Sequence, residues 1–268
     1  MKPLVLTLRA RPEQRLDLSW LVPHRLAGLS AAEVARIALH TTRTPATVGD
    51  MFRVRMGDAR HIRIEGACDR LDRIGEAMTG GEIVVDGDVG ARAGRLMTGG
   101  QLIVRGNAGP WAASGMRGGE LRIAGNADER LGGPLSGETA GMRGGIVVVG
   151  GSVGERAGDR MRRGTIIVEG GAGRYAGSRM IAGTLIVRRQ AGALPGYLMR
   201  RGTIVLGAGA EQLSPTFVDC GVHELLAMKL MAAFVASYSA RLAPTFRRPL
   251  RRLAGDMAVL GKGEIIVR

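Results

Sequence analysis

Aromatic residues make up only 3% of this 268-residue chain. Proteins that bind single-stranded nucleic acids stack bases on aromatic side chains, so this scarcity argues against a nucleic-acid partner. The sequence also lacks any run of about 18 apolar residues that could cross a membrane. Its start, from Met1 to Arg9, lacks the long apolar stretch of a signal peptide. We therefore expect a cytoplasmic protein that does not bind a membrane.

Metal ligands and nucleophile motifs are scarce as well. The two cysteines cannot form a disulfide framework, and together with the four histidines they show no zinc-ligand spacing. No Gly-x-Ser-x-Gly or Walker sequence stands between a strand and a helix. The sequence therefore offers no candidate catalytic residue, cofactor-binding residue or metal ligand. The cysteines and histidines in question are Cys68, Cys220, His24, His40, His61 and His223.

Glycine and arginine, in contrast, are abundant. The chain holds 43 glycines, and its formal net charge is +14, with only three lysines among the 38 basic residues. A net charge of this sign favours an anionic partner.

The glycines belong to a repeat that fills residues 82 to 202. Five copies are 19 residues long and the third, 120 to 145, has 26 and so carries an insertion of seven. The copies begin at Glu82, Gln101, Glu120, Ile146, Thr165 and Thr184, with looser copies before and after them. A fixed short period indicates a solenoid.

The composition of each copy indicates strands rather than helices. Positions 2 and 4 are always aliphatic, position 8 is small, position 16 is methionine in the aligned copies, and glycine occupies position 19 and most copies of position 6. Alternate aliphatic residues share one face of a strand, and glycine permits sharp corners. We predict an all-β fold, a right-handed parallel β-helix of about seven coils, each a triangle of three short strands. The methionines are expected to fill its core.

Three regions follow from this pattern. Residues 1–57 are predicted to form a small N-terminal α+β cap, with a capping box at Ser30 and Glu33, a helix from about 31 to 40 and an extended segment from Val48 to Met56. Residues 58–210 are predicted to form the β-helix. Residues 211–268 are predicted to form an extension with a helix from Val222 to Arg241 and a final strand from Gly263 to Arg268.

Position 3 of the strand should point outward, yet it is apolar in most copies. An apolar ladder across a parallel sheet marks an interface, so either the chain's own C-terminal helix or a partner subunit should cover it. The ladder comprises Val84, Ile103, Val148, Ile167, Ile186 and Val205, interrupted by Arg63 and Arg122.

Positions 17 and 18 carry a second outward ladder, made of arginines. Stacked guanidinium groups repel one another unless they are solvated or paired with anions. Two interpretations stay open: a solvated face, or a contact with an acidic subunit or an acidic carrier tail. The residues are Arg117, Arg143, Arg162, Arg163, Arg200 and Arg201. The insertion, within Glu129 to Gly141, is predicted to form a surface loop that also contacts a partner.

These repeats resemble a known family. The motif Gly-x-[Val/Ala]-Gly followed by the methionine, as in Gly87 to Met97 and Gly151 to Met161, is similar to the C subunit of formylmethanofuran dehydrogenase and to its relative in the bacterial formyltransferase/hydrolase complex. The match covers about residues 48 to 210. The same unit resembles the C-terminal domain of the large subunit of glutamate synthase.

The resemblance implies a non-catalytic structural subunit of a complex that transfers formyl groups from tetrahydromethanopterin to a methanofuran-type carrier and releases formate. Its expected partners are amidohydrolase-like, formyltransferase and dehydrogenase-like B subunits, with zinc on a partner subunit and no cofactor on this chain alone. The glutamate-rich end of such carriers is one candidate ligand of the arginines. Alternatives are the C subunit of a true molybdenum or tungsten formylmethanofuran dehydrogenase, or a glutamate-synthase-like β-helix domain. An independent β-helix acyltransferase is disfavoured, because such enzymes usually show a hexapeptide rhythm with a period of 18.

Overall fold

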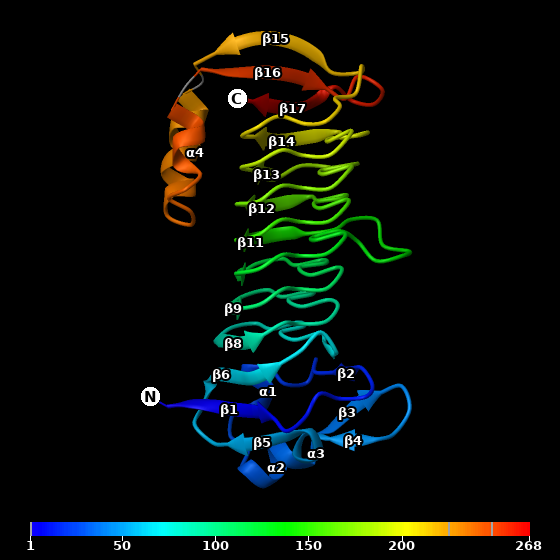
Figure 1. Ribbon diagram of the computed structural model, residues 1–268, viewed down its shortest axis with the longest axis vertical. Coiled ribbons are helices and arrows are strands. Elements are labelled where there is room, and N and C mark those ends of the chain that lie inside the picture. The colour runs from blue at the N-terminus through cyan, green and yellow to red at the C-terminus, as the bar shows by residue number, and fades with distance from the viewer. Residues whose placement is uncertain (1, 225, 248) are drawn as a thin grey trace.

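The protein is mostly β-structure, and its computed structural model describes residues 2–224, 226–247 and 249–268. Within these residues a 13-stranded, largely parallel sheet runs along the long axis of the molecule (Figure 1). Its strand order is β15-β16-β17-β14-β13-β12-β11-β10-β9-β8-β6-β1-β5.

The middle of the sheet is built from one strand per repeat. These strands are β6 (Asp58–Ala67), β8 (Glu82–Gly87), β9 (Gln101–Val104), β10 (Glu120–Ile123), β11 (Arg143–Val149), β12 (Arg163–Val168), β13 (Thr184–Val187) and β14 (Arg201–Leu206). Each pairs in parallel with the next at equivalent positions, for example Ile83 with Leu102 and Leu102 with Leu121. The insertion does not disturb this register, since Leu121 pairs with Val147 on the far side of it.

The core lies behind this sheet and consists of stacked identical positions. Position 2, position 4 and the methionine column are buried throughout the repeats, as at Ile83, Val85 and Met97. A side chain on a strand can contact its equivalent one strand away, because paired strands are about 4.8 Å apart. Stacking therefore converts the sequence repeat into continuous apolar columns.

The remaining sides of each repeat differ from the three short strands that we predict. Position 8 makes a single isolated parallel bridge, as between Val89 and Ala108, and is followed by turns. The turns contain residues with positive φ at position 11, such as Arg92 at 66°, and at position 15, such as Leu96 at 54°. A strand requires negative φ, so this part of the repeat cannot extend into a third strand.

The N-terminal segment continues the sheet and adds a small second one. Strand β1 (Pro3–Leu8) lies between β6, in parallel, and β5 (Phe52–Arg55), antiparallel. The second sheet comprises β2 (Leu16–Asp17), β3 (Ala38–Thr41), β4 (Ala46–Thr47) and β7 (Leu71–Asp72), and the helices are α1 (Pro23–Leu26), α2 (Ala31–Arg36) and α3 (Val48–Met51).

Two N-terminal predictions need correction. The capping box at Ser30 and Glu33 forms, but α2 ends at Arg36, because the next residues pair with β2 and β4. The segment from Val48 to Met56 is not wholly extended. Thr47 and Asp50 form a second capping box, which starts α3 before the chain turns into β5.

The C-terminal segment also differs from its prediction. The predicted helix from Val222 to Arg241 begins only at Leu226, because Val218–His223 form strand β15, which pairs with β16 (Leu250–Gly255). Gly221, with φ at 85°, lies outside helical geometry. Helix α4 (Leu226–Ala236) and the 3-10 helix η1 (Ala243–Arg247) follow, and β17 (Lys262–Val267) adds a last parallel strand beside β14.

Candidate interaction site

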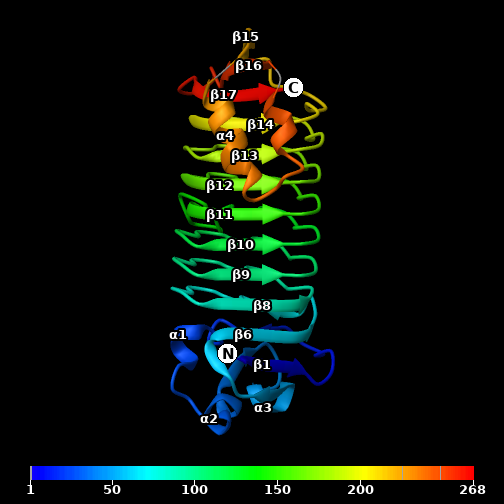
Figure 2. The same cartoon turned by 90° about the vertical axis from the view of Figure 1, so that its left-hand side faces the viewer.

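The outer face of the sheet is covered along half of its length by the chain's own C-terminal segment. Helix α4 lies against the face formed by β11 to β14 (Figures 1 and 2). There the position 3 residues are buried in a second apolar cluster with Met228 and Val235 of α4 and with Leu242 and Phe246 beyond it. These covered ladder residues are Val148, Ile167, Ile186 and Val205.

The other half of the ladder has no such cover among the described residues. Val84 and Ile103 are half-buried, and charged side chains surround them. Asp86 accepts a hydrogen bond from Arg63 at 2.6 Å and pairs with Arg105 at 3.0 Å. Arg122 pairs with Glu120 and lies over the ring of Tyr238, 5.7 Å from its centroid. This half is therefore a mixed surface, suited to a polar contact.

The predicted arginine ladder is exposed throughout, and no ion pair holds its members within the described chain. The strand register places like charges side by side, because Arg143 pairs with Arg163 and Arg201 pairs with Lys262. Adjacent cations in one sheet destabilise it unless anions or solvent compensate. Lys262 extends the ladder, and sequence reasoning missed it because it belongs to the non-repetitive tail.

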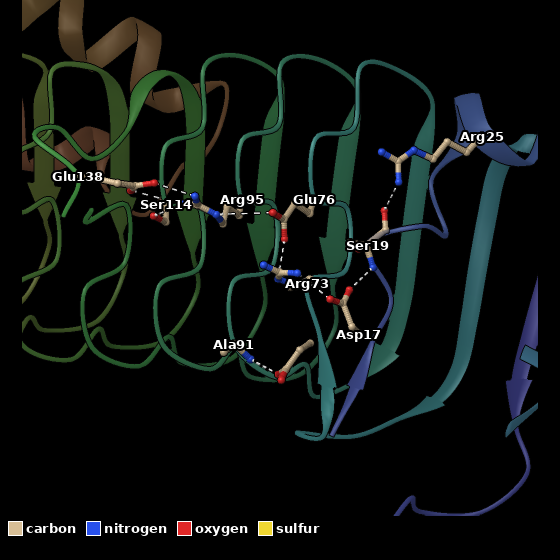
Figure 3. A network of polar contacts seen from close by, with 10 residues as sticks. Asp17, Ser19, Arg25, Arg73, Glu76, Ala91, Arg95, Ser114 and Glu138 are labelled. Carbon is tan, nitrogen blue, oxygen red and sulfur yellow. Dashed lines mark hydrogen bonds and ion pairs between the residues drawn. The ribbon is translucent and has the colours of Figure 1, made fainter. Parts of the chain in front are cut away.

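A chain of alternating charges lies on another side of the repeats (Figure 3). Arg73 donates to Asp17 at 2.7 Å and lies 3.1 Å from Glu76, and Glu76 lies 3.6 Å from Arg95. Arg95 donates to Glu138 of the insertion at 2.7 Å. The network thereby joins the N-terminal segment, two consecutive repeats and the insertion.

This network explains the conformation of the insertion. Glu138 also accepts the backbone N–H of Leu135 at 2.9 Å, and Arg160 donates to its backbone carbonyl at 3.2 Å. Residues 131 to 134 are buried, while the tip at Ser136 and Gly137 is exposed. The loop is thus pinned to its neighbours at both sides. No pattern in the sequence marks this role, since Glu138 lies outside the repeat.

The carboxyl groups in the network have opposite pKa shifts. Burial raises the pKa of Glu76, and its neighbours Arg73 and Arg95 only partly offset that effect. The hydrogen bond from Arg95 lowers the pKa of Glu138, despite its partial burial. Burial alone would raise the pKa of Asp17, but hydrogen bonds from Ser19 and Arg73 lower it overall.

A cleft of about 480 Å³ opens beside the network, between the N-terminal segment and the first repeats. Its lining includes Arg15, His40, Arg92 and Trp111, whose buried indole N–H has no hydrogen-bond acceptor among the residues that the structure describes. The described residues contain no cluster of three His, Cys, Asp or Glu side chains that could hold a metal ion. They also contain no helix with the length and apolar character needed to cross a membrane.

The opposite pKa shifts predict opposite effects for two similar substitutions. Glu76→Gln should leave the free energy of unfolding at pH 7 unchanged or higher, because the pair with Arg73 lacks hydrogen-bond geometry and both arginines keep another acid. Glu138→Gln should lower it by about 1 kcal/mol, because a hydrogen bond between charged groups is lost. Urea unfolding of both variants measures the difference.

The pH dependence gives an independent check. Because the pKa of Glu76 is raised in the folded state, its contribution to the free energy of unfolding is present below its unfolded pKa. That contribution is lost as the pH rises through the folded pKa. The contribution of Glu138 is present above its unfolded pKa and is lost as pH falls through its lowered folded value. In a plot of the free energy of unfolding against pH, each glutamine variant should lack the pH dependence that comes from the glutamate it replaces. Equal destabilisation by both variants would contradict this assignment.

The chain is similar to known proteins, although no protein-family model matches it. The C subunit of the formyltransferase/hydrolase complex Fhc of Methylorubrum extorquens is 53% identical over 263 residues, which are 97% of this chain and 98% of that protein. The C subunit of tungsten-containing formylmethanofuran dehydrogenase 2 of Methanococcus maripaludis is 33% identical over 92 residues, 34% of each chain.

A solved structure is similar over nearly the whole length. It is the X-ray crystal structure of the formyltransferase/hydrolase complex (FhcABCD) from Methylorubrum extorquens in complex with methylofuran. One chain of it aligns with a TM-score of 0.92 and 43% identity, covering 98% of both chains. The likeness therefore includes the C-terminal strands and helix as well as the repeats.

Proposed function

We infer that this chain, which belongs to the family of C subunits of formyltransferase/hydrolase complexes, is a non-catalytic structural subunit of such a complex. The observation that carries this proposal is 53% identity with a known C subunit over 97% of the chain. Likeness to the tungsten formylmethanofuran dehydrogenase subunit is confined to 34% of the chain. The hydrolytic complex is thus favoured over the redox enzyme, and a relation to glutamate synthase stays a prediction.

The complex would pass formyl groups from tetrahydromethanopterin to a methanofuran-type carrier and release them as formate. Support for the carrier comes from the related complex, which was solved with methylofuran. We assign the chemistry, including zinc, to partner subunits of the amidohydrolase-like, formyltransferase and dehydrogenase-like B types. The ladder, cleft and network of this chain offer binding groups, with no paired nucleophile and base among them.

We further propose that the repeats wind as a right-handed parallel β-helix. The strand register advances by 19 residues at nearly every step, and position 8 bridges follow the same period. Right-handedness rests on the general bias of parallel crossover connections. In this proposal residues 1–57 cap one end and residues 211–268 form the extension at the other.

Isolation from the native host tests the assignment. The chain, tagged at one terminus, should co-purify with three different subunits in fixed stoichiometry and with a bound formyl carrier. The purified assembly should release formate from formyl-tetrahydromethanopterin. A stable chain that is isolated alone and catalyses this reaction by itself would contradict the proposed role.

The arginine ladder provides a second test, with a matched control. Exchanging Arg162, Arg163, Arg200 and Arg201 for glutamine should lower subunit assembly or carrier retention, because guanidinium groups bind carboxylates by two-point hydrogen bonds. The difference from the wild type should be largest at low salt, since salt screens pairs of exposed charges. The control makes the same charge change at exposed arginines of the N-terminal segment, Arg36, Arg43, Arg53 and Arg55. Unchanged stoichiometry and carrier content in the first variant would leave only a solvated face.

A further inference from the structure

Helix α4 has apolar side chains on both of its sides. Met228 and Val235 face the sheet and are buried. On the opposite side Leu226 is 73% exposed and Leu230 is 68% exposed, with Phe234 one turn further on. Residues four apart share one side of a helix, so these three form a continuous stripe. Lys229 is the single charged residue in the eleven residues of α4.

Strand β15, which precedes α4 by two residues, also exposes apolar side chains. Val222 is 60% exposed and Val218 is 52% exposed. Strand β15 is the outermost strand of the sheet in the described chain, so one of its edges lacks a backbone partner there. Proteins normally shield such edges, and exposed apolar patches of this kind mark binding surfaces.

A second copy of the chain is a poor occupant for this surface. In a two-fold contact the same stripe would meet itself, and α4 offers no acidic side chain that could pair with Lys229 of the other copy. Two chains of net charge +14 would also repel each other. A different protein with an apolar contact surface and an acidic rim would match this surface better. Its apolar surface would cover the stripe, and its acidic groups would pair with the positive charge of this chain.

We propose that the outer stripe of α4, together with the edge strand β15, is the docking surface for another subunit of the same complex. This inference rests on the proposed function. It is supported by the likeness to a chain of the solved complex over 98% of both chains, which includes this C-terminal segment. In this proposal the inner side of α4 covers the sheet, and its outer side binds the partner subunit.

The test uses the whole complex, produced from its four genes together. Leu226→Glu and Leu230→Glu, made together, should reduce co-purified partner subunits at least about ten-fold, because buried interface anchors dominate binding. Both side chains are mostly exposed, so the variant should fold like the wild type, as judged by circular dichroism and melting temperature. The matched control, Trp20→Glu with Met56→Glu, makes the same charge change at exposed apolar residues of the N-terminal segment and should assemble normally.

A measurement on the unaltered protein covers the case in which the double variant fails to fold. Amide hydrogen exchange in residues 226 to 236 should slow on assembly into the complex, relative to the isolated chain. Full assembly of the folded variant, or unchanged exchange, would overturn this inference and leave the proposed function intact. Self-association of the isolated chain through α4, or its binding to phosphatidylglycerol vesicles through α4, would overturn it as well. Failure of the wild-type chain to bind any partner subunit would overturn both proposals.

Discussion

Replacing Ile186 with aspartate is expected to detach the C-terminal segment from the sheet. Ile186 lies at position 3 of β13 between Ile167 and Val205, completely buried beneath the C-terminal segment that includes α4. The cluster members described around it are all apolar, so a carboxylate placed there gains no cation from them. An uncompensated buried charge costs about 3–5 kcal/mol. Urea unfolding would show the loss of stability, and limited proteolysis within residues 224 to 249 would show release of the segment.

The same substitution at Ile103 is the matched control. Ile103 occupies the same repeat position on β9, but it is half-buried, lies next to Arg122 in the strand register and has no cover from α4. Ile103→Asp should therefore cost less than about 1 kcal/mol, as is usual for substitutions at the surface. Equal destabilisation of both variants would show that α4 does not protect the ladder.

This contrast shows what sequence reasoning could and could not predict. Repetition fixes the side-chain direction at every strand position, so the inward columns and the outward ladder were predictable from one copy. The part of the ladder that the C-terminal segment covers could not be predicted from the repeat. The cover depends on where a non-repetitive tail folds back, and that tail changes from strand to helix between His223 and Leu226.

The candidate site was predictable to a similar degree. The arginines at positions 17 and 18 are all exposed. Alternation after the inward methionine at position 16 accounts for position 17 alone, because adjacent residues of a strand point to opposite faces. The charge network was not predictable, because its members hold different residue types at equivalent positions. Glu76, Arg95 and Ser114 follow one another at intervals of 19 residues, and Arg95 donates a hydrogen bond to the Ser114 hydroxyl at 3.2 Å. A search for repeated residues does not detect a repeat position that holds an acid, a base and a hydroxyl in successive copies. The hydrogen bonds and ion pairs between neighbouring copies nevertheless depend on that change of residue type.

Glycine at position 19 offers the second large effect. Gly119→Ala should lower the free energy of unfolding by more than about 3 kcal/mol. A left-handed residue with a side chain costs roughly 1–2 kcal/mol, and Gly119 has φ at 81°. In addition, an alanine Cβ would lie 2.7 Å from the carbonyl oxygen of Gly100 and 2.7 Å from the Cε of Met97 in the preceding repeat. Overpacking of this kind typically adds about 1–3 kcal/mol.

Gly137→Ala separates the two causes. Gly137 has φ at 85°, but no atom lies within 4 Å of its added Cβ at the tip of the insertion, so only the backbone term of about 1 kcal/mol should remain. Chemical denaturation of both variants gives the difference, and equal costs would mean that stacking does not select glycine. A positive φ alone does not require glycine in this repeat, since Arg92 and Arg156 at position 11 adopt φ values of 66° and 58°. Glycine at position 19 is therefore required chiefly by the backbone and methionine of the repeat stacked against it.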